Sequence, residues 1–262
     1  MPQFLLKPEA LIEKPDPQGL KGAHFRLTGP DAFHIAKVLR RRAGEALELF
    51  DGHGGRFHGT ISKVSPEEIL GVIVDAVKPP PAQHARLHLF PGLLKAAAWE
   101  WVLEKGTELG VASFTPVITP RTVVLLEREH THAKRERWEK ILLAAAKQCK
   151  RADLPRLNEP MRFSDAIHAA ADRGLTLLSW EGMAGAAAHE SLGAALKDVT
   201  REEGKTAELS LFLGPEGGFT DEEIELAEAV GAVSFGLGPN TLRAETAALA
   251  ATTAVLYELE LL

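Results

Sequence analysis

The chain has 262 residues, of which 45% are hydrophobic and 25% are charged, and its formal net charge is −6. These proportions are those of a globular protein, so they exclude a disordered, collagen-like or wholly coiled-coil chain. The single cysteine, Cys149, excludes an intramolecular disulfide and the cysteine-rich zinc sites. Taken alone, the negative total charge argues against a nucleic-acid partner.

The N-terminus lacks the pattern of an export signal. Its apolar runs, such as Phe4 to Leu6, are only three residues long, whereas a secretory signal needs roughly 7–15 apolar residues. No uncharged apolar run reaches the roughly 18 residues of a membrane span. We therefore expect a soluble cytoplasmic protein, with no membrane partner and no metal site.

The first segment of the chain predicts a small β-barrel with one helix. Residues 46–50 and 56–61 alternate between apolar and polar positions around the turn residues 51–55, which is typical of a hairpin. Residues 69–77 are a further run rich in β-branched side chains, and helical spacing of apolar residues covers 31–41. Together these elements predict one domain over residues 1–78.

Three consecutive prolines, Pro79 to Pro81, predict an extended connector to a second domain over residues 82–262. Residues 1–80 carry a net charge of +1 and residues 82–262 a net charge of −7. In the second domain, apolar strands are expected to alternate with helices, which favours a parallel α/β sheet. The expected strands are 86–91, 112–118, 175–180, 209–213 and 232–236, and the expected helices are 95–109, 132–149, 164–172, 187–198, 220–230 and 243–259.

A glycine loop, residues 213–220, follows one predicted strand and precedes a helix that Thr220 and Glu223 should cap as a capping box. Glycines let a backbone approach a ligand closely, and the carboxyl ends of parallel strands are where α/β sheets bind ligands. The same glycines would also serve a tight turn that binds nothing. The loop is neither a Walker A motif nor a Gly-x-Gly-x-x-Gly motif.

A second Gly/Pro loop, residues 236–242, follows the next predicted strand and leads into a helix that begins near Arg243 and Glu245. Two such loops after successive strands favour one shared pocket. The helix then continues from Thr246 to Tyr257 without a charge. A helix this apolar is usually buried in a core or in a subunit interface.

The charge is unevenly distributed. Residues 121–156 hold ten Lys and Arg against five acids, a net of +5, and Arg40 to Arg42 form a second basic cluster. Such clusters suit contacts with phosphate, although a solvated helix face with mixed ion pairs has the same composition.

Five ordered motifs resemble the bacterial 16S ribosomal RNA uridine-N3 methyltransferases, the RsmE family of the SPOUT class. The resemblance covers most of the chain. The similar stretches are His34 to Arg40, Glu104 to Val111, Arg137 to Pro155, Gly214 to Gly218, and Leu237 to Ala247. The chain departs from the family pattern at Pro2-Gln3-Phe4, where relatives often have an arginine, and at Asn240, Ala244 and Cys149.

This resemblance implies a PUA-like RNA-binding domain followed by a SPOUT domain with a trefoil knot, and it implies a homodimer. The knot loops would bind S-adenosylmethionine, and 16S rRNA of the small ribosomal subunit would be the partner. The residues then expected to hold the cofactor, mostly through their backbone, are Leu213, Gly214, Gly217, Gly218, Leu237, Gly238 and Leu242.

The expected reaction is methylation of uridine N3, a weak acid that must lose its proton before it attacks. Arg243 is the candidate for stabilising the charge that develops on the base oxygens, and Glu216 or Glu245 would accept the proton or hold Arg243. Phosphate contacts are expected from Arg40, Arg137 and Arg151. The alternatives are a SPOUT methyltransferase acting on another rRNA or tRNA position, or a non-catalytic RNA-binding assembly factor.

Overall fold

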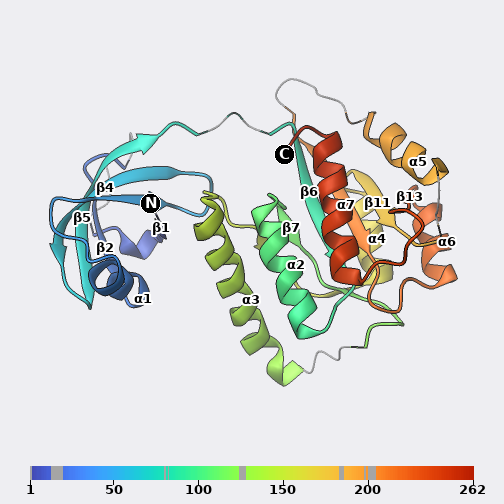
Figure 1. The fold of residues 1–262 in the computed structure, drawn as a ribbon, viewed down its shortest axis with the longest axis horizontal. Coiled ribbons are helices and arrows are strands. Elements are labelled where there is room, and N and C mark those ends of the chain that lie inside the picture. Colours follow the sequence, from blue (N-terminus) through green and yellow to red (C-terminus); the bar gives the residue numbers. More distant parts are fainter. Residues whose placement is uncertain are drawn as a thin grey trace. The chain divides into compact units, whose positions relative to one another are not determined.

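The chain folds into two compact units, which are described separately (Figure 1). Unit 1 comprises Met1–Pro81 and Ala146–Leu154, and unit 2 comprises Ala82–Ala145 and Pro155–Leu262. The sequence had placed 146–154 with the second domain. The computed structural model describes residues 2–12, 20–79, 81, 83–123, 128–182, 186–197, 199 and 205–262, except the side chains of 128–131 and 186–191. Pro80, residues 124–127 of the basic stretch and the end of predicted helix 187–198 lie outside the described residues.

Unit 1 is built on a mixed sheet with the strand order β1-β3-β4-β5-β2. The strands are β1 (Gln3–Leu5), β2 (His24–Thr28), β3 (Ala46–Phe50), β4 (Arg56–Val64) and β5 (Glu68–Val77). The predicted hairpin is confirmed, because β3 and β4 pair antiparallel from Ala46↔Thr60 to Phe50↔Arg56. In the turn, the Asp51 carboxylate accepts hydrogen bonds from the backbone amides of His53 (2.7 Å) and Gly55 (2.9 Å).

The helix predicted over residues 31–41 is shorter and irregular. It consists of an α-helical turn, α1 (Pro30–Phe33), that continues into a π-helical segment, η2 (His34–Val38). Arg40 follows with a φ of 54°, in the left-handed region that a right-handed helix cannot include. The strand β2 was not predicted from the sequence, although Phe25 and Leu27 are buried and alternate with exposed residues there.

A buried glutamine joins the two chain segments of unit 1. The Gln3 side chain is 4% exposed, and its amide nitrogen donates to the backbone oxygens of Ala146 (3.1 Å) and Arg151 (2.6 Å). Lys147 forms an ion pair with Asp31 at 2.7 Å. Gln3 therefore anchors the chain segment 146–154 to this unit.

Unit 2 has the α/β architecture that the sequence predicts. Its six-stranded sheet is parallel throughout, with the order β13-β11-β12-β6-β7-β9, so the carboxyl ends of the strands share one edge. The strands are β6 (Ala85–Pro91), β7 (Ser113–Phe114), β9 (Arg156–Leu157), β11 (Leu175–Ser179), β12 (Ala207–Leu213) and β13 (Val233–Phe235).

The prediction of one continuous strand over 112–118 is wrong. The segment forms β7 and then β8 (Val117–Ile118), which pairs with β10 (Met161–Arg162) outside the six-stranded sheet. Pro116 lies between the two strands. A proline has no amide hydrogen to donate to a ladder, so it ends the pairing at this position.

Helices cover both faces of the sheet (Figure 1). One face packs against α2, α3, α5 and α7 through a core that includes Trp99, Trp138 and Val255, and the other packs against α4 and α6 through Phe163 and Ile224. The helices are α2 (Ala96–Glu108), α3 (Arg128–Cys149), α4 (Phe163–Ala171), α5 (Ala186–Lys197), α6 (Asp221–Ala229) and α7 (Ala244–Glu258). The predicted fold class is therefore confirmed, and the trefoil knot stays a prediction.

The predicted capping box at the start of α6 is confirmed. The Thr220 hydroxyl accepts a hydrogen bond from the Glu223 amide at 3.3 Å, and the Glu223 carboxylate accepts one from the Thr220 amide at 2.9 Å. This pair satisfies two backbone donors at the helix end. It also fixes the point where the first glycine loop passes into α6.

Candidate functional site

A cleft of about 970 Å³ lies in unit 2 beyond the carboxyl ends of β11, β12 and β13. Its volume lies within the range of about 300–1,000 Å³ typical of small-molecule sites. Four chain segments contribute residues to its lining, and both predicted glycine loops are among them. The lining residues lie within 95–101, 179–181, 214–219 and 237–247. The structure thus brings the two loops together as the sequence predicts.

The first loop, between β12 and α6, turns tightly at Gly218. This residue has a φ of +69°, and its amide donates to the Pro215 carbonyl at 2.9 Å. Gly214, Glu216 and Gly218 line the cleft. Two of the predicted cofactor residues do not line it: Leu213 is 2% exposed at the end of β12, and Gly217 lies against Arg121.

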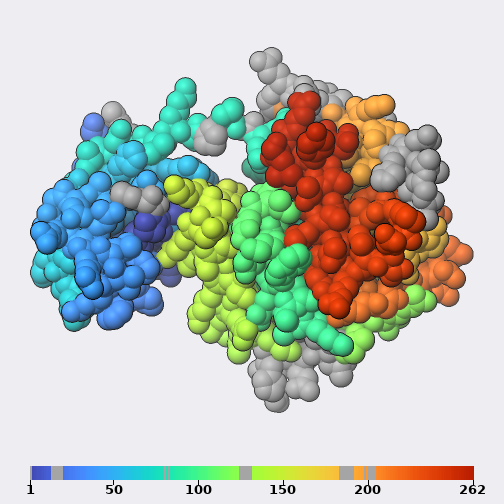
Figure 2. Space-filling model, in the orientation of Figure 1, coloured from blue at the N-terminus to red at the C-terminus, as the bar shows by residue number. Residues whose placement is uncertain are grey.

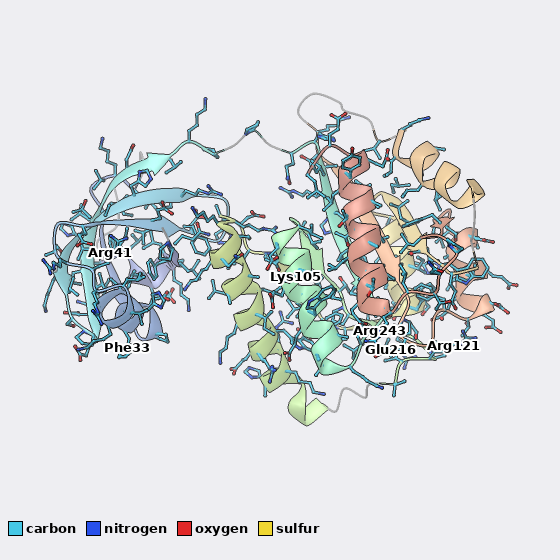
Figure 3. The ribbon with its side chains drawn as sticks, viewed as in Figure 1. Phe33, Arg41, Lys105, Arg121, Glu216 and Arg243 are labelled. Atoms are coloured by element: carbon cyan, nitrogen blue, oxygen red, sulfur yellow. The ribbon has the colours of Figure 1, made fainter. Side chains whose placement is uncertain are left out.

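The second loop, between β13 and α7, and the first turn of α7 together contribute every residue from Leu237 to Ala247 to the cleft. The predicted cofactor residues Leu237, Gly238 and Leu242 therefore share the cleft with Arg243 and Glu245. Arg243 is the N-cap residue of α7, and its side chain is exposed. Figure 3 shows Arg243 and Glu216 at the same end of unit 2.

Glu216 connects the first loop to the start of α2. Its carboxylate accepts a hydrogen bond from the backbone amide of Lys95, the N-cap of α2, at 3.2 Å. A carboxylate at this position complements the positive end of the helix dipole. Among the described residues, no ion pair joins Arg243 to Glu216 or to Glu245, so the predicted holding of Arg243 by either carboxylate is not present in this structure.

The acidic start of α6 lies next to the first loop. Burial raises the pKa of the Glu223 carboxyl, while the hydrogen bond from the Thr220 backbone and the charge of Arg121 act in the opposite direction. For Glu222, a hydrogen bond from its own backbone and one from the Thr220 side chain lower the pKa. The positive charge of Arg121 thus favours the ionised forms of Glu222 and Glu223 at the junction of the first loop and α6.

Several residues of the cleft were not predicted from the sequence. Lys95 and Trp101 come from α2 and the segment before it, and Trp180 and Glu181 follow β11. The last two could have been found, because residues that follow parallel strands gather at the carboxyl edge of a sheet. No sequence pattern indicates Trp101, which reaches the cleft through the packing of α2.

The three predicted phosphate contacts lie in different surroundings. In unit 1, Arg40 is exposed, whereas Arg151 pairs with Asp153 at 2.7 Å and its side chain is 10% exposed. In unit 2, Arg137 pairs with Glu100 at 2.6 Å, and this hydrogen-bonded pairing raises the pKa of the guanidinium. Arg40 and Arg137 are both exposed, and of the three only Arg40 has no acidic partner among the described residues.

The residues that the structure describes hold no group of three or more His, Cys, Asp and Glu side chains that could bind a metal ion. No helix among them has the length and apolar character needed to cross a membrane.

Comparison with known families matches most of the chain. Residues 81–256 match the RNA methyltransferase domain family, and residues 27–74 match the RNA methyltransferase PUA domain family. The chain is 30% identical over 238 residues to the ribosomal RNA small subunit methyltransferase E of Bacillus subtilis, an alignment that covers 91% of each chain.

Solved structures agree with these matches. A methyltransferase of Legionella pneumophila, in complex with the bound cofactor SAM, is 28% identical, with a TM-score of 0.78 and coverage of 97% of this chain and 98% of that one. A ribosomal RNA small subunit methyltransferase E of Neisseria gonorrhoeae, bound to S-adenosyl methionine, is 25% identical, with a TM-score of 0.78 and coverage of 98% and 97%.

Proposed function

Because this chain belongs to the ribosomal RNA small subunit methyltransferase E family, we propose that it transfers a methyl group from S-adenosylmethionine to N3 of one uridine in 16S rRNA. The observation that carries this proposal is the cleft that both loops share at the carboxyl edge of the sheet. Both glycine loops and the exposed Arg243 line it. The proposed place of action is the cytoplasm, where small ribosomal subunits assemble.

The cleft fits the cofactor in size and in the character of its walls. At Gly238, with a φ of +108°, no atom lies within 4 Å of where a Cβ would be, so a side chain would project into open space. Backbone groups of Gly214, Gly218, Leu237 and Leu242 would hold the cofactor in the open space beside Gly238. When bound, S-adenosylmethionine supplies a methyl group already activated by the cationic sulfonium. The protein must then position the uracil and favour its deprotonated form.

Arg243 is suited to stabilise the deprotonated uracil. Loss of the N3 proton places negative charge on the neighbouring carbonyl oxygens of the base. A guanidinium fixed near the cleft would stabilise that charge more effectively than water, because it needs little reorganisation. The backbone of Arg243 is fixed as the N-cap of α7, and the residue lines the cleft where the base is proposed to bind.

The two cleft carboxylates differ in their surroundings, which separates their proposed roles. Glu216 accepts the Lys95 amide and so helps to hold the first loop against α2. Glu245 lies in the first turn of α7, two positions beyond Arg243, and lines the cleft. We assign Glu245 as the proton acceptor and Glu216 as the residue that holds the loop.

Mass spectrometry of 16S rRNA nucleosides tests the proposed function. Undermethylated small subunits are incubated with the protein and S-adenosylmethionine, and N3-methyluridine is expected at one position. A methyl group found elsewhere in rRNA or in tRNA would favour the alternative SPOUT substrate. If unmodified RNA is recovered and calorimetry detects no cofactor binding, the protein is better described as an assembly factor.

Unit 1 is proposed to bind the RNA around the target uridine, with Arg40 as a phosphate contact. Replacing Arg40 with glycine removes the charge and also relieves its left-handed backbone, which costs a non-glycine residue about 1–2 kcal/mol. We expect a more stable protein that binds RNA more weakly, with the slope of log K against log salt reduced by about 1. Arg40→Lys, which keeps the charge, should bind RNA almost as well as the wild type. Unchanged RNA affinity in Arg40→Gly would remove Arg40 from the interface.

The homodimer is proposed to form through the outward face of α7. A groove of about 660 Å³ runs along this face between Trp101 and Tyr257. These two aromatic side chains are 41% and 72% exposed, and aromatic side chains are enriched at protein interfaces. In Figure 2, α7 and α2 form neighbouring parts of the surface of unit 2.

A charge within this groove should prevent dimerisation. Ala250 lines the groove, so Ala250→Glu would bury an unpaired carboxylate in the proposed interface. Light scattering is expected to give the mass of one chain for this variant and of two chains for the wild type. Ala169→Glu places the same charge on the exposed face of α4 and should remain dimeric. A dimeric Ala250→Glu would refute the proposed interface.

A further inference from the structure

Arg121 reaches the first glycine loop from another part of unit 2. It lies in the short segment that follows β8, within a turn held by two threonines. The Thr119 amide donates to the Thr122 hydroxyl at 2.9 Å, and the Thr122 amide donates to the Thr119 carbonyl at 3.1 Å. Because both bonds lie inside the turn, the backbone of Arg121 is held independently of the glycine loop.

The Arg121 guanidinium bonds to the loop at two points. Its Nη1 donates to the carbonyl oxygens of Gly217 (3.0 Å) and Phe219 (2.8 Å). These carbonyls flank Gly218, the residue with a φ of +69° where the loop turns. Fixing both carbonyls fixes the Gly217–Gly218 peptide plane, directly before Gly218, and the Phe219–Thr220 plane, one residue beyond it. The orientation of the loop at the cleft therefore depends on a side chain that does not itself line the cleft.

The absence of a side chain at Gly217 is explained by the same contact. A Cβ at this position would lie 3.0 Å from the Cβ of Arg121 and 3.5 Å from its backbone oxygen. The sequence indicated Gly217 as a cofactor residue, but its neighbour here is Arg121. Glycine at 217 thus allows the arginine turn and the glycine loop to approach each other closely.

We propose that Arg121 is a positioning residue of the methyl-transfer site, which holds the first glycine loop in the shape that receives the cofactor. This inference rests on the proposed function. It differs from the role that the basic stretch 121–156 suggested, namely contact with RNA phosphates. A phosphate contact would act on RNA affinity, whereas a loop-holding residue acts on cofactor affinity. Figure 3 shows Arg121 at the end of unit 2 where Glu216 also lies.

The two roles are separated by measuring both affinities in the same variants. Arg121→Ala removes both hydrogen bonds to the loop. Since a hydrogen bond to a charged group contributes about 1.5–3 kcal/mol, we expect the Kd for S-adenosylmethionine to rise about 10- to 100-fold. The KM for the small subunit should stay within about twofold of the wild type, because the RNA contacts are untouched. Arg121→Lys keeps the charge, but its ammonium ends one bond short of the Nη1 position, so its Kd should lie between those of the wild type and Arg121→Ala.

Two controls make the result decisive. Arg162→Ala removes an exposed arginine of unit 2 that lies outside both the cleft and the basic stretch, and it should match the wild type in every measurement. Thermal unfolding shows whether each variant folds. If Arg121→Ala does not fold, Arg121→Lys alone decides the proposal through its cofactor Kd.

A raised RNA KM with an unchanged cofactor Kd would overturn the proposal in favour of a phosphate contact. Equal cofactor Kd values for the wild type, Arg121→Ala and Arg121→Lys would also overturn it. The proposed function itself is tested with the wild-type protein alone. If the wild type neither binds S-adenosylmethionine nor methylates the subunit, that function fails, whatever the variants do.

Discussion

Replacing Arg243 with alanine is expected to lower kcat by about 10²- to 10³-fold and to leave the Kd for S-adenosylmethionine near its wild-type value. Arg243 lines the cleft beside the second loop, but it is not among the residues whose backbone is proposed to hold the cofactor. Removing the guanidinium therefore removes charge stabilisation from the transition state. Single-turnover methylation with saturating cofactor, paired with calorimetry, measures the two quantities.

Arg243→Lys serves as the matched variant for this test. A lysine supplies a positive charge without the planar fork of the guanidinium, so partial recovery of kcat is expected. Arg162→Ala again provides the control for loss of an exposed arginine in unit 2. Methylation by Arg243→Ala at the wild-type rate would exclude Arg243 from the chemistry. A large rise in the cofactor Kd would instead assign it to cofactor binding.

Replacing Gly92 with alanine is expected to weaken cofactor binding about 100-fold. Gly92 follows β6, and its amide donates to the Leu213 carbonyl at 2.7 Å, directly before the first loop. An added Cβ would lie 2.5 Å from the Pro215 nitrogen and 3.0 Å from the Pro215 Cα. These are backbone atoms, so the loop itself must move, and a displacement near 1 Å can cost about 10²-fold. Calorimetry with S-adenosylmethionine measures the effect.

The Gly92→Ala variant should also lose about 1–3 kcal/mol of stability through overpacking. Gly44→Ala separates this loss from the effect on the site. Gly44 has a φ of +90° in unit 1 with nothing within 4 Å of an added Cβ, so alanine there introduces strain without displacing the loop. A similar fall in cofactor affinity in both variants would show that lowered stability, and not movement of Pro215, is responsible.

Local patterns in the sequence predicted several elements of this site correctly. The capping box at Thr220 and Glu223 depends on side chains three positions apart, so its residues alone predict the start of α6. The alternation of strands and helices predicted a parallel sheet, and such a sheet places the ends of its strands at one edge. The loops at Gly214 and Gly238 each follow one of these strands, so they share one cleft.

The sequence also indicated RNA in spite of the net charge of −6, because the basic residues are clustered and the motifs are ordered. It could not assign a partner to each basic residue. Arg121 and Arg151 both belong to the basic stretch, yet one holds the glycine loop and the other pairs with Asp153. Composition counts charges, whereas the partner of a charge depends on which side chains folding places within a few ångströms of it.

What the sequence determined by itself is therefore local: hydrophobic periodicity, glycine loops, the cap of α6 and the residues that carry the family resemblance. What only the tertiary structure decided is the set of long-range contacts. The Arg121 guanidinium donates to the Phe219 carbonyl, the Lys95 amide donates to the Glu216 carboxylate, and Gly92 packs against Pro215. These partners lie about a hundred or more positions apart in the chain. No spacing rule relates such residues, because the distance between them is set by the packing of the whole sheet and its helices.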